Sequence, residues 1–120
     1  MPRLKKVIAW AAVAMAISAT AAGAADRKEA RNQVEFGIRV AAQGLWREAI
    51  YRWERAVELD PTYAAAYNNL AVAYETFGEF EKAKRAYEKA IELDPKNTYV
   101  RQNFDLFKEI NDRASRQTTR

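Results

Sequence analysis

The sequence predicts an all-α protein built from two stacked helical hairpins and a fifth, capping helix. The first observation is a repeated phrase: "ERAVELDP" at residues 54–61 returns as "EKAIELDP" at residues 88–95, an interval of 34 residues. The second is that apolar residues around both copies recur at spacings of three and four, which marks one face of a helix. The third is that glycine and proline recur in the same register. A fixed period between about 20 and 50 residues is typical of arrays in which each repeat is one supersecondary unit.

Six residue pairs keep the 34-residue interval. They are Gly44 and Gly78, Trp46 and Phe80, Ala49 and Ala83, Trp53 and Tyr87, Ala56 and Ala90, and Pro61 and Pro95. Each repeat is therefore expected to form one pair of helices, at 30–43 with 46–59 and at 64–77 with 80–93.

The glycines and prolines fall where these helices should end. Gly44 and Gly78 follow the first helix of each pair, and glycine accepts the left-handed conformation that ends a helix at low cost. Pro61 and Pro95 follow an aspartate after the second helix. Proline cannot continue a helix, and its ring pushes the preceding residue toward an extended shape.

The repeated small and aromatic residues are interpreted as core. Ala49 and Ala83 should face a partner helix at close approach, where a larger side chain would overpack. Four aromatic residues should fill the wider gaps between helices: Trp46, Trp53, Phe80 and Tyr87. This aromatic stripe is therefore predicted to be core packing and not a cofactor site.

A fifth helix is predicted at residues 98–112. It carries apolar residues at helical spacing, and repeat arrays need a terminal element that covers the last apolar face. Its apolar residues are Val100, Phe104, Leu106, Phe107 and Ile110. Residues 113–120 contain no apolar anchor and are predicted to form a polar, flexible tail.

Residues 1–25 have the features of a secretory signal peptide. Basic residues in the first six positions precede an apolar run at 7–17, and Ala22-Gly23-Ala24 has the small-x-small form of a cleavage site. The mature chain is then expected to begin at Ala25 or Asp26 and to be exported, either to the periplasm or out of the cell. The alternative is an uncleaved membrane anchor, although the alanine content makes the run weakly apolar for a membrane span.

Charge and composition argue against several functions. The chain has 20 basic and 16 acidic residues, but removal of residues 1–25 takes away three basic residues and leaves 17 against 16, a balance of +1. The signs alternate along the chain, so no nucleic-acid partner is expected. No cysteine or histidine is present, so no metal, cofactor or catalytic site is predicted. Carboxylate pairs such as Glu54 with Glu58 alternate with basic residues and are interpreted as solvated ion pairs rather than as an active site.

Residues at the key positions of both repeats match a known helical-hairpin repeat. In the second copy these are Tyr67, Leu70, Ala71, Tyr74, Gly78, Phe80, Ala83, Tyr87, Ala90 and Pro95, and in the first they are Phe36, Gly37, Gly44, Trp46, Ala49, Trp53, Ala56 and Pro61. The chain resembles the tetratricopeptide repeat family over roughly residues 30–110. The resemblance implies a short right-handed superhelical stack at 26–112, with repeats at 30–63 and 64–97 and a capping helix at 98–112.

The resemblance also implies a site, because the first helix of each hairpin in this family lines a concave groove. Carried over by position, the groove residues are Val34, Glu35, Ile38, Asn68, Asn69, Val72, Glu75, Thr76, Gln102, Asn103 and Leu106. Some members hold a peptide's terminal carboxylate with cations and asparagines. Asn69 matches one such asparagine, but Val34, Tyr99 and Asn103 stand where cations would be expected. Recognition of a terminal carboxylate is therefore not expected.

The predicted function is protein binding. An aliphatic stripe (Val34, Ile38, Val72 and Leu106) beside amides suits an amphipathic helix or an extended peptide. The alternative for the stripe is that part of it packs within the array. Two further functions stay open: a self-assembling module that acts as a homo-oligomer, and a membrane-tethered assembly factor if the signal peptide is retained.

Overall fold

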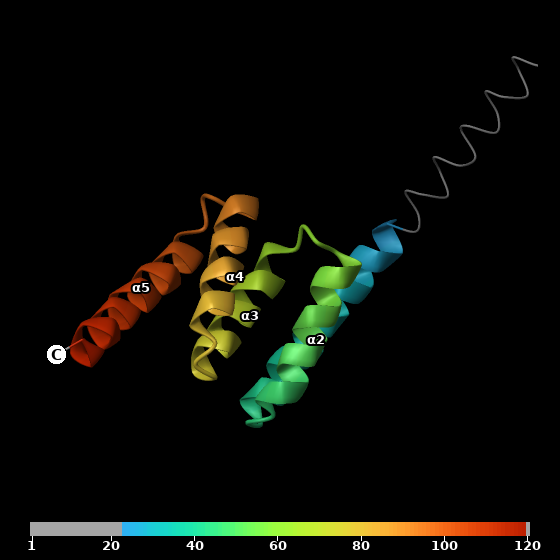
Figure 1. Cartoon of the computed structure of the whole chain (residues 1–120). Coiled ribbons are helices and arrows are strands. Elements are labelled where there is room, and N and C mark those ends of the chain that lie inside the picture. Colours follow the sequence, from blue (N-terminus) through green and yellow to red (C-terminus); the bar gives the residue numbers. More distant parts are fainter. Residues whose placement is uncertain (1–22, 120) are drawn as a thin grey trace, which may run out of the picture.

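The structure is a computed structural model that describes residues 23–119. Within this range all regular structure is helical, which confirms the all-α class and the stack of antiparallel hairpins. A first helix covers residues 23–42. It is followed by α2 (Trp46–Leu59), α3 (Ala64–Thr76), α4 (Phe80–Leu93) and α5 (Thr98–Thr118). The first helix lies beside α2, α3 lies beside α4, and α5 lies beyond α4 (Figure 1).

The N-terminal boundary differs from the prediction. The first helix is present from residue 23, well before the predicted start at residue 30. The added turns are largely exposed and contain alanine, arginine, lysine and glutamate, which favour helix without needing a buried face. Residues 1–22 of the predicted signal peptide lie outside the described residues, so that prediction stays a prediction.

Both hairpins turn through the same hydrogen-bonded motif. Gly44 and Gly78 have positive φ angles of 80° and 72°. Around Gly44, the Leu45 amide donates to the Val40 carbonyl at 3.0 Å, and the second hairpin repeats this bond from Glu79 to Tyr74 at 2.8 Å. This pattern satisfies carbonyls that the helix end would otherwise leave free. The predicted left-handed glycines are confirmed.

The proline junctions also follow the prediction. Asp60 and Asp94, which precede the two prolines, have φ angles of −138° and −139° and are not helical. Helices α2 and α4 therefore end one residue earlier, at Leu59 and Leu93. After the second junction, the side chain of Asn97 accepts a hydrogen bond from the Val100 amide at 3.3 Å and caps α5.

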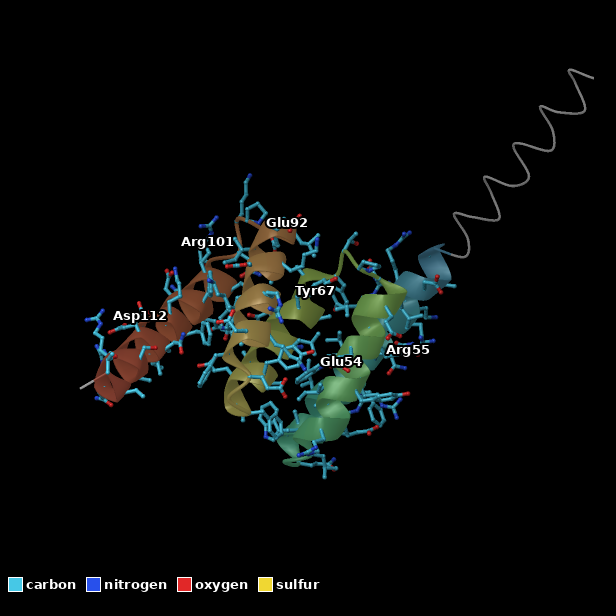
Figure 2. All side chains as sticks on the ribbon, in the orientation of Figure 1. Glu54, Arg55, Tyr67, Glu92, Arg101 and Asp112 are labelled. Atoms are coloured by element: carbon cyan, nitrogen blue, oxygen red, sulfur yellow. The ribbon has the colours of Figure 1, made fainter. Side chains whose placement is uncertain are left out.

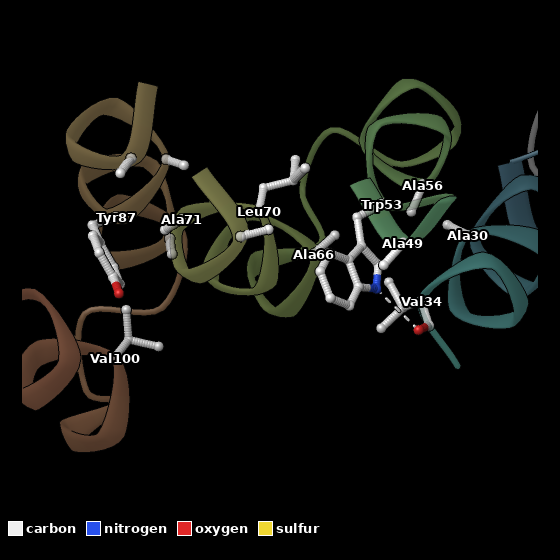
Figure 3. Packing of buried hydrophobic residues seen from close by; sticks show 14 of the residues in the cluster. Ala30, Val34, Ala49, Trp53, Ala56, Ala66, Leu70, Ala71, Tyr87 and Val100 are labelled. Carbon is white, nitrogen blue, oxygen red and sulfur yellow. Dashed lines mark hydrogen bonds between the residues drawn. The ribbon is translucent and has the colours of Figure 1, made fainter. Parts of the chain in front are cut away.

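The core of the first hairpin is built around Trp53. This side chain is 4% exposed, and its indole nitrogen donates to the Val34 carbonyl at 3.1 Å (Figure 3). Ala49 on the same helix and Ala83 in the second repeat are both fully buried, as the predicted close approach at these two alanines requires.

The second hairpin and α5 share an aromatic cluster. The ring of Tyr87 lies 5.5 Å from the ring centroids of both Phe104 and Phe107, so α5 covers the last apolar face of α4. Phe80 departs from the prediction, because it is 44% exposed and does not fill a gap in the core. It stands at the first position of α4, where its ring has an aromatic neighbour, Phe107 at 6.3 Å, but remains open to solvent.

Helix α5 continues beyond its predicted end at residue 112, as far as Thr118. The extension is polar and exposed, and its stabilising contacts are local. Arg113 pairs with Glu109 one turn earlier, and the hydroxyls of Ser115 and Thr118 donate to backbone carbonyls four residues before them, at 2.9 and 3.0 Å. Residues 113–118 are thus helical within the segment predicted as a polar, flexible tail, and its flexibility stays a prediction.

Candidate functional site

The first helix, α2, α3 and α5 all contribute to the lining of a small pocket. Its volume is about 180 Å³. Its lining residues are Ile38, Ala41, Trp46, Trp53, Asn68, Asn69, Val72 and Tyr99. Four of the sequence-predicted groove residues, Ile38, Asn68, Asn69 and Val72, are therefore brought together at one place.

Two asparagine side chains connect α3 with α5 beside this pocket. Asn68 is 7% exposed, and its side-chain oxygen accepts a hydrogen bond from the Asn103 amide of α5 at 3.5 Å. Among the described residues, no buried side-chain nitrogen or oxygen lacks a hydrogen-bond partner. The hydrogen bond between Asn103 and Asn68 links α5 to α3, and Asn69 is partly exposed in the pocket lining.

A row of exposed apolar side chains extends from the pocket along α5. Tyr99, Leu106 and Ile110 are 64%, 57% and 51% exposed. They lie four residues before and three and seven residues after Asn103, so they share the helix face that Asn103 presents to α3. Together with Ile38 and Val72 they form what we call the inner apolar row.

Val34 does not belong to this row. It is 4% exposed, and its backbone carbonyl is hydrogen-bonded to Trp53. Its predicted place in the groove is therefore wrong, and the alternative that part of the stripe packs within the array holds for this residue. Its position on the first helix faces α2 rather than the groove.

The remaining predicted groove residues are at the edges. Glu75 is half-buried and accepts a hydrogen bond from the Tyr87 hydroxyl at 3.0 Å. Burial and this carboxylate raise the pKa of Tyr87, so its hydroxyl stays protonated. The Thr76 hydroxyl donates to the Val72 carbonyl at 2.8 Å. Glu35 and Gln102 are exposed. These residues can contact a ligand only at the rim.

Sequence reasoning missed four residues of this site. The sequence pattern predicts a core role for Trp46 and Trp53, and both residues also line the pocket. By family position Tyr99 only replaces an expected cation, and Ile110 is predicted only as an apolar residue of the fifth helix. The spacing of Tyr99, Leu106 and Ile110 around Asn103 was the available signal, because it places all four on one helix face.

Three other features are absent from the described part of the chain: a cluster of metal ligands, charged residues in the pocket lining, and a membrane-spanning helix. No group of three or more His, Cys, Asp or Glu side chains within residues 23–119 is placed to hold a metal ion. The pocket lining contains no lysine, arginine or carboxylate. Over the same range, every helix is too short or too polar to cross a bilayer.

Comparison with known families agrees with this geometry. Residues 64–97 match the model of the tetratricopeptide repeat, and residues 39–76 match a second TPR repeat model. The chain belongs to the tetratricopeptide repeat family. Members of this family are generally non-enzymatic protein–protein interaction modules.

Individual relatives share the repeat region. The chain is 34% identical over 74 residues to the tetratricopeptide repeat domain-containing protein PYG7, chloroplastic, of Arabidopsis thaliana, covering 62% of this chain and 25% of that protein. It is 33% identical over 82 residues to the type IV pilus assembly protein PilF of Pseudomonas aeruginosa, covering 68% of this chain and 32% of that one. The chain thus spans a third or less of the length of these two curated relatives.

The fold is also shared with a solved structure. The crystal structure of MamA superposes with a TM-score of 0.66 at 31% identity, over 70% of this chain and 49% of MamA. This similarity covers the helical stack and supports its assignment as a tetratricopeptide repeat array.

Proposed function

We propose that the chain is an exported adaptor that holds a helical or extended segment of a partner protein in its concave groove. The observation that carries this proposal is the inner apolar row, in which Ile38, Tyr99, Leu106 and Ile110 are all more than half exposed. Apolar side chains aligned beside amides suit the apolar face of an amphipathic helix or alternate side chains of an extended peptide.

The charge of the pocket lining indicates which part of a partner protein it would bind. No cation lines it, so nothing there would neutralise a terminal carboxylate, and an internal segment of the partner is favoured. Two repeats offer a short groove, which we expect to bury less surface than a standard stable interface. A single contact should then be weak, with a dissociation constant on the order of micromolar.

Site-specific photo-crosslinking in the native host tests the groove. A photoreactive amino acid at position 106, which is exposed on α5, should capture a specific partner. The matched control carries the same amino acid at position 88, which is exposed on α4 away from the pocket. Capture of the same protein with equal yield from both positions would refute the groove as the binding site.

Export rests on the basic, apolar and small-residue segments of residues 1–25. Intact-mass spectrometry of the native protein tests it, since the processed chain should begin at Ala25 or Asp26. A chain that retains Trp10 would instead support the membrane-tethered assembly factor. That second candidate draws on one similarity, because PilF is named for an assembly role.

Self-assembly is the other candidate, and the observation that favours it is the exposure of Leu106 and Ile110 on the terminal helix. Light scattering coupled to size exclusion separates it from the adaptor. We expect a monomeric mass that does not change with protein concentration, whereas a mass that rises with concentration would favour self-assembly.

A further inference from the structure

A second groove lies on the other side of α3, between α2 and α4. Its volume is about 360 Å³. From α3 it is lined by Tyr67, Leu70 and Tyr74, which are spaced by three and four residues and so share one helix face. The residues of α3 that line the concave pocket, Asn68, Asn69 and Val72, point from the opposite face. We call this second site the outer groove.

The floor of the outer groove is apolar. Val57 of α2 adds to the two tyrosines and Leu70, and all of these side chains are at least partly buried. Tyr67 of α3 and Glu54 of α2, both labelled in Figure 2, line the groove from these two neighbouring helices. An apolar floor of this kind favours a ligand that places an apolar side chain on it.

One wall of the outer groove is basic. Lys82, Arg85 and Lys89 of α4 all line it, and their spacing of three and four residues places them on one helix face. The acidic residues of α4, Glu81, Glu88 and Glu92, are not in the lining. Three of the four basic residues of α4 are therefore turned toward the groove, while Lys84 and the acidic residues lie outside its lining.

The lining of the outer groove contains one negative charge, and that carboxylate already accepts a hydrogen bond. Glu54 is the one carboxylate among its lining residues, and it accepts a hydrogen bond from the Tyr74 hydroxyl at 2.8 Å. Burial and this carboxylate raise the pKa of Tyr74, which keeps the hydroxyl protonated as the donor.

The three cations remain open to a ligand. Lys82 pairs with Glu79 at 2.8 Å and Lys89 with Glu92 at 3.5 Å, but both pairs are at the surface, where such interactions are weak and exchange readily. Arg85 takes part in none of the ion pairs found among the described residues. A guanidinium binds a carboxylate through two parallel hydrogen bonds, so Arg85 is the strongest of the three contacts.

We infer that the outer groove binds a short acidic peptide segment that carries an apolar side chain. The apolar side chain lies on the Tyr67 and Tyr74 floor, and carboxylates on either side of it contact the row of Lys82, Arg85 and Lys89. A polyanion such as nucleic acid fits less well, because the basic row covers only two helical turns and Glu54 lies across from it. This site is separate from the concave groove and goes beyond the proposed function.

Fluorescence anisotropy of the full chain with a labelled peptide of sequence EDLFDE tests the inference. Arg85→Glu should weaken binding by about tenfold or more, because it replaces an attraction with a repulsion. Lys89→Glu provides a second variant with the same expectation. The matched control is Lys84→Glu, which makes the same charge change on the exposed side of α4 outside the groove and should change binding by less than about twofold.

Two further probes distinguish specific binding in the outer groove from non-specific attraction between opposite charges. The peptide EDSSDE keeps the charges but lacks the apolar pair and should bind much more weakly than EDLFDE. A single-stranded oligonucleotide should not compete at equal charge concentration. The inference is overturned if Lys84→Glu weakens binding as much as Arg85→Glu, if EDSSDE binds as tightly, or if the oligonucleotide displaces the peptide. Thermal melts of each variant establish that it is folded.

Discussion

The indole ring of Trp53 occupies the space that a side chain at position 37 would need. A Cβ atom built on Gly37 would lie 2.4 Å from the Trp53 indole nitrogen, which is closer than non-bonded atoms approach. The first helix and α2 can therefore pack as closely as they do at this point only because residue 37 has no side chain. The same nitrogen is held by its hydrogen bond to the Val34 carbonyl, so the ring cannot easily move aside.

Gly37→Ala should therefore destabilise the protein, even though alanine normally favours helix over glycine. We expect a loss of roughly 1–3 kcal/mol in the free energy of unfolding, as for overpacked cores. Urea denaturation followed by circular dichroism measures it. The control is a double-mutant cycle with Trp53→Phe, since the smaller ring leaves room and should reduce the cost of Gly37→Ala. Equal costs in both backgrounds would contradict the steric explanation.

Substitution of the turn glycines should lower stability because of their backbone conformation and not because of a steric clash. A Cβ atom at Gly44 or Gly78 would meet nothing within 4 Å, yet both residues have positive φ. Alanine at either position should cost about 1–2 kcal/mol, the penalty of the left-handed conformation. Gly78→Asn should cost less than Gly78→Ala, because asparagine tolerates this conformation. Thermal unfolding gives the order, and an asparagine variant less stable than the alanine variant would disprove the assignment.

Ala83 provides a test of the helix pairing. It is fully buried where α4 packs in the core, so Ala83→Phe must displace neighbouring side chains or backbone. The expected loss is roughly 1–3 kcal/mol or more in the free energy of unfolding. Ala65→Phe places the same ring at an exposed position of α3 and should change stability by less than about 0.5 kcal/mol. If the two variants lost the same stability, the buried contact at residue 83 would be refuted.

The parts of the fold that depend on local sequence could be predicted. Helix ends at Gly44, Gly78 and the two prolines follow from backbone chemistry that acts within a few residues, and the structure has them at the predicted places. The terminal boundaries could not be predicted in the same way. Residues 23–29 and 113–118 are helical although they bury almost nothing, so the apolar pattern gave no sign of them.

The candidate site was only partly predictable for a related reason. Family position grouped Ile38, Asn68, Asn69 and Val72, and the structure has all four in the lining of one pocket. It failed for Val34, since whether a residue near a helix edge faces the groove or the partner helix depends on the crossing of the two helices. The Trp53 ring fills the space beside Gly37, and the pattern of a single helix does not show how closely its partner approaches there.

The extended end of α5 should contribute little to stability. Phe107 is the last buried side chain of this helix, and the contacts beyond it are local and exposed. A chain that ends at Asp112 should lose less than about 0.5 kcal/mol in the free energy of unfolding, as expected for surface changes. Phe107→Ala should lose roughly 3–5 kcal/mol, because it leaves a cavity beside Tyr87. A truncation as costly as Phe107→Ala would show that residues 113–118 stabilise the fold through contacts of their own.

A substitution at an exposed residue of the concave groove should change partner binding without changing the stability of the fold. Val72 lines the pocket but also packs against the core, so Val72→Glu should weaken partner binding with some loss of stability. Leu106 is 57% exposed, so Leu106→Glu should weaken binding by about tenfold or more while leaving the melting temperature nearly unchanged.

Calorimetry with the partner captured by crosslinking measures this effect. Glu109→Leu serves as a control, since it adds an apolar residue on α5 outside the inner apolar row and should not strengthen binding. Unchanged affinity of the Leu106→Glu variant would exclude the inner apolar row as the contact surface, because a carboxylate desolvated against an apolar ligand face cannot be neutral in energy.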